Sequence, residues 1–283
     1  MMRAYFVLCS AVGWLLRSGK YSRVRIVCQH GECRVRKRRL FYAPLLVWLG
    51  GPLVRVLNTG VRVLPQRDWE HRERRINWSL RGWSILIDPG GTVVMPHLAG
   101  TTLASVLEDR EVEAPARKRA IAWAVVALAD FHRLGFTHGD AMAENVLVDP
   151  EARVAHWFDF ETVHDSVRPM LWRRADDLRA LLATCVVRTA PDKRADIVQH
   201  ILDVYQDSEV TRLVAASFSS VYCRPLPFYL AQARLSFGGF REIGELLGAS
   251  ERRERAARSE RAGVAASESA CRGGRGAKPL GKA

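Results

Sequence analysis

Three side chains in the middle of the chain have the types and spacing of a phosphoryl-transfer site. Asp140 lies on a predicted tight loop, five residues before Asn145, and an apolar run follows that loop. Asp159 ends a second apolar run fourteen residues after Asn145. If the two runs pair as a β-hairpin, the Asp140 carboxylate can face a substrate hydroxyl while Asn145 and Asp159 return to one metal ion. The pattern predicts one base and two metal ligands that converge.

The order of these residues resembles the two active-site loops of the protein-kinase-like superfamily, which read H-x-D-x-x-x-x-N and D-F-G. In this chain the first loop runs from His138 to Asn145 and the second from Asp159 to Glu161. The resemblance implies that Asp140 is the catalytic base and that Asn145 and Asp159 bind Mg²⁺. It also implies that ATP is the phosphoryl donor.

The same resemblance nominates residues that hold ATP from a small β lobe. Residues 14–39 are predicted to form a β-meander, and Gly19 opens a degenerate glycine-rich loop at its first turn. Lys37, on the third strand, is expected to contact the α and β phosphates. Because side chains alternate along a strand, Arg36 and Arg38 should point the other way, and a register error of one residue would nominate them instead.

A helix predicted over residues 67–80 supplies the partner of Lys37. Glu73 resembles the helix glutamate that pairs with the strand lysine. Glu70 lies one turn earlier on nearly the same face and is the rival. The cofactor-binding positions implied by the resemblance are Lys37, Glu73, Gly19, Asn145 and Asp159.

Two long helices are expected to support the catalytic loop. Residues 116–134 carry apolar side chains at helical spacing, which is typical of a core helix. Residues 172–187 are predicted to form the next helix, and its opening turns carry Asp176 and Asp177. The resemblance implies that one of these two carboxylates accepts hydrogen bonds from the loop backbone, and Asp177 fits slightly better because Leu178 follows it.

The element order predicts an α+β, bilobal protein-kinase-like fold with a small, mostly β N-lobe and a larger, mostly α C-lobe. We place the N-lobe, a nucleotide-binding sheet plus one helix, at residues 1–97. The C-lobe, with the catalytic and metal-binding loops, follows at 98–248. Residues 249–283 are rich in Arg, Ala, Ser and Gly and are predicted to be a basic disordered tail. The apolar stretch 41–64 receives no function.

Composition bounds the environment and the partners. The chain has 283 residues, a net charge of +13 and a sequence pI near 10.0, which favours an anionic partner. Its six cysteines include no C-x-x-C pair, so we expect neither a zinc site nor a disulfide framework, and a reduced cytosol fits best. The apolar run 4–16 is too short to span a bilayer and is interpreted as the first strand of the chain and its approach.

Four departures from protein kinases narrow the expected substrate. Gly139 and Met142 stand where regulated protein kinases carry Arg and Ser/Thr kinases carry Lys, and Glu161 replaces the Gly of D-F-G. Only seventeen residues separate Asp159 from the helix carboxylate Asp177, with no A-P-E motif between them. These features resemble the aminoglycoside kinases and the lipopolysaccharide-core (Kdo/heptose) kinases.

We therefore expect a kinase that moves the γ-phosphate of ATP to a hydroxyl of a glycolipid, such as lipopolysaccharide core, or of another small molecule. The expected location is the cytoplasm, peripheral to the inner membrane. One alternative is a pseudokinase that serves as a nucleotide-binding or partner-binding scaffold. Another is an atypical kinase that acts on serine or threonine or is associated with nucleic acid, which the lack of aromatic platforms makes less favoured.

Overall fold

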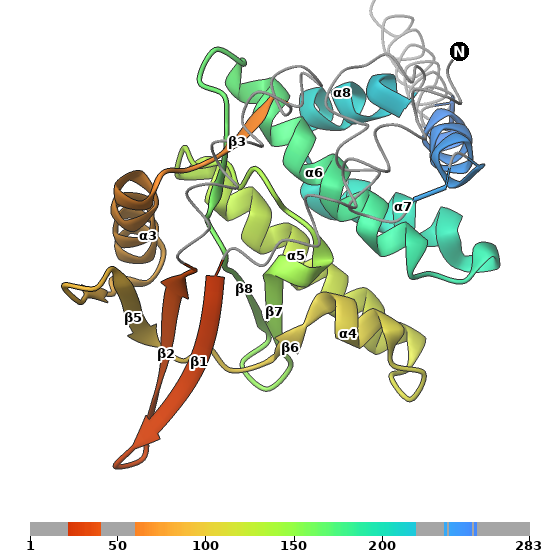
Figure 1. Ribbon diagram of the computed structural model, residues 1–283. Coiled ribbons are helices and arrows are strands. Elements are labelled where there is room, and N and C mark those ends of the chain that lie inside the picture. The colour runs from red at the N-terminus through yellow and green to blue at the C-terminus, as the bar shows by residue number, and fades with distance from the viewer. Residues whose placement is uncertain (1–21, 41–59, 219–234, 237, 251, 254–283) are drawn as a thin grey trace, which may run out of the picture.

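The computed structural model describes residues 22–40, 60–218, 235–236, 238–250 and 252–253, which form a small β-rich lobe beside a larger helical lobe (Figure 1). The predicted α+β, bilobal class is therefore confirmed. The expected binding position Gly19, the apolar run 4–16 and most of the predicted tail lie outside the described residues. No helix in the described ranges has the length and apolar content that a membrane crossing needs.

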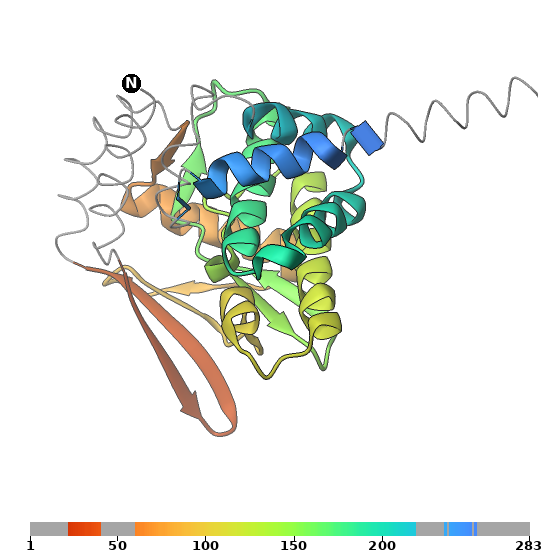
Figure 2. The same cartoon turned by 90° about the vertical axis from the view of Figure 1, so that its right-hand side faces the viewer.

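The small lobe is built on a four-stranded antiparallel sheet in the order β1-β2-β5-β4. Strands β1 (Ser22–Gln29) and β2 (Glu32–Arg39) form a long hairpin that extends beyond the rest of the molecule (Figures 1 and 2). Its two turn residues, His30 and Gly31, both have positive φ, 52° and 83°, as a tight hairpin turn with right-handed strand twist requires. The predicted turn is confirmed.

Strand β2 also pairs with β5 (Thr92–Pro96), which in turn pairs with β4 (Leu86–Ile87). Helix α3 (Gln66–Arg81) packs on this sheet through a small core of Leu64, Trp69, Ile85 and Val93. A separate pair of short strands, β3 (Val61–Val63) and β9 (Thr162–His164), connects the segment before α3 to the segment after the second active-site loop.

The large lobe consists of helices around one apolar core (Figure 2). Its described helices are α4 (Leu103–Glu108), α5 (Ala114–Arg133), α6 (Met170–Val187), α7 (Arg194–Tyr205), α8 (Ser208–Phe218) and residues 238–250, with short 3-10 turns at Ala143–Asn145 and Pro191–Lys193. Strands β6 (Thr101–Thr102), β7 (Val146–Asp149) and β8 (Val154–Trp157) form a small sheet beside α5. The hairpin predicted between the two active-site loops is thus present as β7 and β8.

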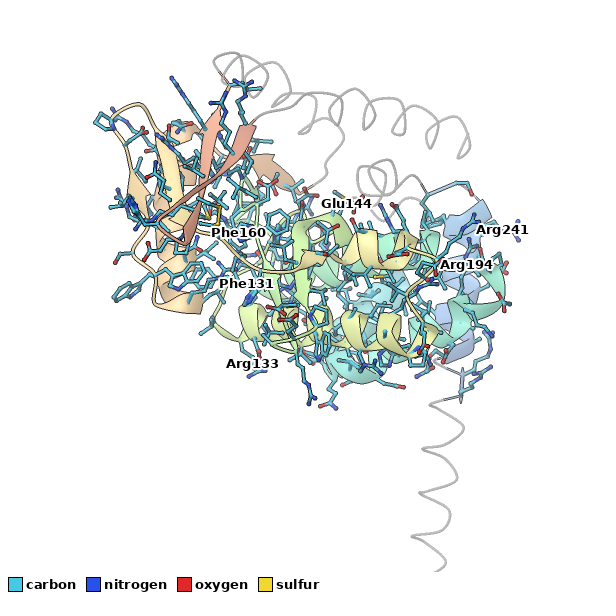
Figure 3. All side chains as sticks on the ribbon, turned by 90° about the horizontal axis from the view of Figure 1, so that it is seen from below. Phe131, Arg133, Glu144, Phe160, Arg194 and Arg241 are labelled. Atoms are coloured by element: carbon cyan, nitrogen blue, oxygen red, sulfur yellow. A yellow bond between two sulfur atoms is a disulfide. The ribbon has the colours of Figure 1, made fainter. Side chains whose placement is uncertain are left out.

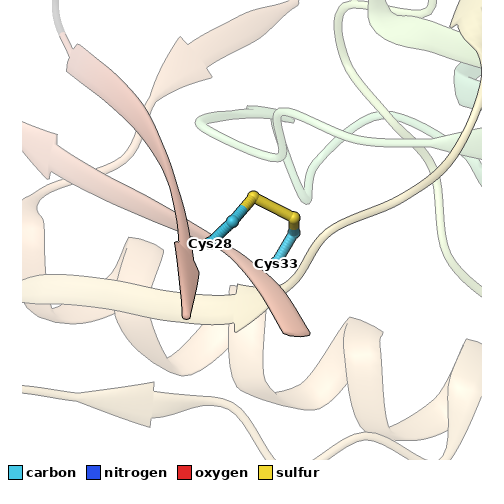
Figure 4. Close-up of a disulfide and its surroundings, with 2 residues drawn as sticks. All are labelled: Cys28 and Cys33. Carbon is cyan, nitrogen blue, oxygen red and sulfur yellow. A yellow bond between two sulfur atoms is a disulfide. The ribbon is translucent and has the colours of Figure 1, made fainter. Parts of the chain in front are cut away.

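One expectation about the cysteines is wrong, because Cys28 and Cys33 form a disulfide across the β1–β2 hairpin (Figure 4). The two-residue turn makes Gln29 and Glu32 the first facing pair, so Cys28 and Cys33 face each other in the next one. Their Cα atoms are 4.0 Å apart, because directly opposed residues of an antiparallel pair come closest at such positions. The sequence feature that indicates this disulfide is the two-residue turn, which sets the register of the strands, and not a C-x-x-C spacing.

The crossing from β5 to β6 depends on Gly100. Its φ is +108°, and a Cβ atom there would overlap the carbonyl oxygen of Val148 on β7. Gly135 has a φ of +81°, and a Cβ atom at that residue would have no other atom within 4 Å. The first glycine therefore meets both a conformational and a steric constraint, and the second only the conformational one.

We predict that Gly100→Ala lowers the free energy of unfolding by at least ~2 kcal/mol more than Gly135→Ala, because backbone overlap adds to the cost of the left-handed conformation. Gly135→Ala should itself cost roughly 1–2 kcal/mol. Urea denaturation followed by circular dichroism measures both. Equal losses in the two variants would show that β7 can move away from residue 100 at no cost.

Candidate functional site

Lys37 lies on the inner face of β2 and is almost fully buried, with 6% of its surface exposed. Its Nζ is 2.5 Å from Oδ1 of Asp159, 2.8 Å from Oε1 of Glu161 and 3.9 Å from Oε1 of Glu73. Its neighbours on the strand, Arg36 and Arg38, are exposed. The alternation along the strand therefore selects Lys37, as predicted, and the alternative register does not apply.

Glu73 reaches Lys37 from the buried face of α3. Its carboxylate also accepts hydrogen bonds from Nε1 of Trp69 at 3.1 Å and from Nδ2 of Asn77 at 3.2 Å. Burial raises the pKa of Glu73, while the charge of Lys37 acts against that rise. The rival Glu70 accepts a hydrogen bond from Gln66 instead. The structure thus brings Glu73 to Lys37.

Three carboxylates surround Lys37, and they favour its protonated, positively charged form. Burial alone would lower the pKa of the Lys37 amine, but Asp159, Glu161 and Glu73 together raise it above its ordinary value. Arg39, two residues along the same face, lies 4.9 Å above the ring of Trp69 and 3.9 Å from Oε2 of Glu161. Glu161 also accepts a hydrogen bond from the Ser22 hydroxyl at the start of β1.

His138 fixes the geometry of the catalytic loop. The backbone N–H of Asp140 donates to Nδ1 of His138 at 3.2 Å, and Nε2 of His138 lies 2.9 Å from the carbonyl oxygen of Phe158. An accepting Nδ1 requires the proton on Nε2, so the ring is neutral and donates to Phe158. Burial lowers the pKa of His138 to about 4, which agrees with that state. One buried imidazole thus connects the two active-site loops.

Asp177, two turns into α6, anchors the same loop. Its carboxylate accepts the backbone N–H groups of His138 and Gly139 at 2.7 and 2.8 Å, and it lies 3.0 Å from Nε2 of His132. Burial favours the protonated form, but the surrounding histidines lower the pKa of Asp177 to about 2. Asp176 bonds with His164 instead, at 3.1 Å. The preference for Asp177 is confirmed.

Gly139 allows the loop to turn between these contacts. Its φ is +83°, and a Cβ atom would lie 3.0 Å from the Cα of Val163 on β9. A side chain at this position would therefore meet backbone in a conformation that favours glycine. The departure from the protein-kinase pattern at Gly139 is therefore explained by the local backbone structure.

Asp140 and Asn145 are joined directly. Nδ2 of Asn145 donates to the carbonyl oxygen of Asp140 at 2.8 Å and to its Oδ2 at 2.9 Å. Oδ1 of Asp140 is buried and has no hydrogen-bond partner. Burial, and after it the nearby charge of Asp159, raises the pKa of Asp140 to about 8. The carboxyl group thus has one oxygen left for a further partner.

Asn145 and Asp159 offer oxygen atoms that suit Mg²⁺. The backbone carbonyl of Asn145 accepts the N–H of Phe158 at 3.1 Å, which places Asp159 next to it. Because Nδ2 of Asn145 bonds to Asp140, its amide oxygen is left for another partner. The described residues contain no cluster of three or more His, Cys, Asp or Glu that could hold a metal alone. A magnesium ion bound here would take its other ligands from phosphate and water, as it commonly does.

Packing inside the large lobe holds the segment that carries Asp159. Phe160, which follows Asp159, stacks on Phe131 of α5 with ring centroids 5.5 Å apart, and both rings lie together in Figure 3. The structure brings together Lys37, Glu73, Asp140, Asn145 and Asp159, while Gly19 is outside the described residues. Sequence reasoning missed the ion pair between Glu161 and Lys37. Its only signal was a carboxylate in place of the expected glycine.

Part of the chain matches a known protein family, and its fold is similar to solved kinases. Residues 91–205 match the model of the lipopolysaccharide kinase (Kdo/WaaP) family. The fold is similar to that of a MAP kinase from Leishmania major, at 15% identity and a TM-score of 0.36 over 81% of this chain and 82% of that chain. It is also similar to Rad53 1–466 in complex with AMP-PNP, at 13% identity and a TM-score of 0.34 over 81% of this chain and 57% of that chain.

No curated protein sequence matches the chain. The family match covers β5, the two loops of residues 138–145 and 159–161, and helix α6, which carries Asp177. That range contains Asp140, Asn145, Asp159 and Asp177, but neither Lys37 nor Glu73. The similarity to the lipopolysaccharide kinase family is thus shown for residues 91–205 of the chain.

Proposed function

We propose that this protein transfers the γ-phosphate of ATP, with Mg²⁺, to a hydroxyl group of a glycolipid acceptor. The observation that carries the proposal is the Asp140 carboxylate, which has one oxygen bound by Asn145 and the other buried without a partner. A substrate hydroxyl would supply the missing partner. In the same site lie one buried lysine for the phosphates and two oxygen ligands for a metal ion.

Each residue has a separate task in this proposal. Lys37 contacts the α and β phosphates and is oriented by Glu73, which α3 holds in place. Asn145 and Asp159 would hold Mg²⁺, which neutralises phosphate charge when it is bound. Asp140 orients the acceptor hydroxyl and takes its proton.

The pKa of Asp140 sets the expected pH dependence of the proton transfer. With a pKa of about 8 in the free protein, the carboxyl group is partly protonated at neutral pH. Only the ionised form can accept a proton, so kcat/KM is expected to rise with pH through that range. The positive charge of bound magnesium would move the rise to lower pH.

Two features support a glycolipid as the acceptor. The family model that matches residues 91–205 describes lipopolysaccharide kinases. In addition, the exposed face of the β1–β2 hairpin places Arg23 opposite Arg38 and Arg25 opposite Arg36. Facing like charges destabilise a sheet. Asp88 lies 3.3 Å from Arg36, and an anionic partner would relieve the repulsion that remains. We accordingly propose that the protein acts at the cytoplasmic face of the inner membrane, with residues 1–97 as N-lobe, 98–248 as C-lobe and 249–283 as a basic tail.

The second candidate function is nucleotide or partner binding without transfer. Met142 favours it, because this residue is buried, packs with Val61 and Ala180, and supplies no cation to the transferred phosphate. Labelled ATP incubated with the protein and separate lipid, glycan, RNA and protein fractions decides between the two. Label in the lipid or glycan fraction supports the proposal, whereas ATP binding without transfer to any fraction supports the second candidate.

We predict that Asp140→Asn abolishes phosphate transfer and leaves the affinity for ATP within a few fold, because Asp140 contacts the acceptor and not the nucleotide. The same change should stabilise the nucleotide-free protein at alkaline pH. The pKa of Asp140 is raised on folding, so its ionisation destabilises the fold increasingly as pH rises from about 4 to about 8. The stability gain of the variant should grow by on the order of 3 kcal/mol between pH 5 and pH 8.

Transfer assays and urea denaturation at the two pH values measure this prediction. Asp192→Asn, at an exposed carboxylate in the turn before α7, is the matched control and should change neither quantity. Full turnover in Asp140→Asn would remove Asp140 from the mechanism. A stability gain that does not depend on pH would mean that this carboxyl group is not the buried acid described above.

We predict that Asp159→Asn weakens Mg²⁺-dependent ATP binding by more than tenfold, because a neutral amide replaces a charged metal ligand. Glu161 and Glu73 still surround Lys37 in this variant, so the fold should persist. Isothermal titration with ATP, with and without magnesium, measures the effect. The assignment fails if the magnesium dependence of binding is the same as in the wild type.

We predict that changing Arg36 and Arg38 together to Gln weakens binding to anionic vesicles or raises the KM for a membrane-embedded acceptor. Each arginine should contribute about 1 kcal/mol near anionic lipid, less at high salt. The KM for ATP should stay constant, since both side chains point away from Lys37. The control is Arg110→Gln with Arg119→Gln, two exposed arginines of the C-lobe. Unchanged vesicle binding at low salt would remove this surface from the proposal.

A further inference from the structure

A pocket lies on the opposite side of α3 from the site of Lys37. It has a volume of about 450 Å³ and lies between the exposed side of α3 and the segment that leads into β4. Its lining residues are His71, Arg74, Arg75, Trp78, Trp83, Ser84 and Ile85. The four from α3 follow the helical spacing that places side chains on one face. A pocket of this size suits a small molecule.

The lining combines positive charge with exposed aromatic surface. Two of the seven residues are arginines, a third is a histidine, and none is acidic. Within the described ranges, neither Arg74 nor Arg75 forms an ion pair with a carboxylate. Trp78 is 63% exposed and is the only tryptophan or phenylalanine among the large exposed apolar side chains of those ranges. An indole left in water beside unpaired guanidinium groups is typical of a binding surface.

Several lining side chains are already held in position. The Arg75 guanidinium lies 4.9 Å above the ring of Phe136. Arg81 lies 5.4 Å above the ring of Trp83 and donates to the carbonyl oxygen of Trp157 at 2.7 Å. Side chains ordered in advance lose less conformational entropy when a ligand binds. The pocket is therefore partly preorganised for ligand binding.

We propose that this pocket binds a phosphate ester carried on a ring, with the phosphate on Arg74 and Arg75 and the ring against Trp78 and Trp83. Guanidinium groups match the geometry of phosphate oxygens, and indole rings stack on flat or apolar ring faces. The chain's own tail is not a suitable occupant, because residues 251–283 carry nine Arg or Lys against four Glu. The proposal does not depend on the transfer activity, because the Lys37 site lies on the other face of α3.

Titration calorimetry with phenyl phosphate, inorganic phosphate and phenol tests the proposal. Phenyl phosphate should bind about tenfold more tightly than inorganic phosphate, because the ring adds stacking to the ionic contacts. Phenol should not bind measurably. Changing Arg74 and Arg75 together to Gln should weaken phenyl phosphate binding at least tenfold, and Trp78→Ala should remove the advantage over inorganic phosphate. Trp78 is largely exposed, so its truncation leaves the core intact.

Two controls separate this pocket from general charge and from the nucleotide site. Arg62→Gln with Arg67→Gln removes two exposed positive charges near α3 without touching the pocket and should leave binding unchanged. Asp159→Asn should also leave it unchanged. Binding that survives the Arg74 and Arg75 changes, or that is lost in Asp159→Asn alone, overturns the proposal, as does equal affinity for phenyl phosphate and inorganic phosphate.

Discussion

The buried amine of Lys37 is the interaction on which the rest of the site depends. It joins β2 to α3 through Glu73 and joins the small lobe to the loop of residues 159–161 through Asp159 and Glu161. Removing so many charges from water is costly, and only close contacts between opposite charges offset that cost. The register of β2, the rotation of α3 and the path of the loop must therefore all bring these charged groups together. A change in any one of them would leave a buried carboxylate without its cation.

The large lobe solves a related problem around Asp177. The catalytic loop turns sharply at Gly139, so its backbone N–H groups cannot pair in a helix or strand, and two of them bond to one carboxylate. Nε2 of His132 contacts the same carboxylate, and Nδ1 of His132 lies 2.6 Å from the hydroxyl of Tyr205 on α7. The position of Asp140 is thus determined by a buried polar network that extends through α5, α6 and α7.

Local patterns predicted the parts of this site that are close in sequence. Strand alternation was enough to select Lys37 over Arg36 and Arg38, because one face of β2 is buried. Helical spacing left Glu73 and Glu70 open, and only the packing of Trp69 in the small core decides between them. The Cys28–Cys33 disulfide was missed although the turn that creates it was identified, because pairing was judged from cysteine spacing and not from register. Contacts such as Glu161 with Lys37 join residues far apart in the chain, and no local periodicity reports them.

The charge balance around Lys37 bears on how the proposed nucleotide site would be filled. Glu73, Asp159 and Glu161 carry three negative charges against the two positive charges of Lys37 and Arg39, and Asp140 adds a fourth when it ionises. A polyphosphate alone would meet net repulsion in such a site, because like charges at low dielectric repel strongly. A divalent cation bound together with the phosphates would reverse this balance, and Lys37 could then exchange Asp159 for a phosphate oxygen. Nucleotide and metal binding should therefore be strongly coupled in this protein, with Asp159 as the residue that responds to both.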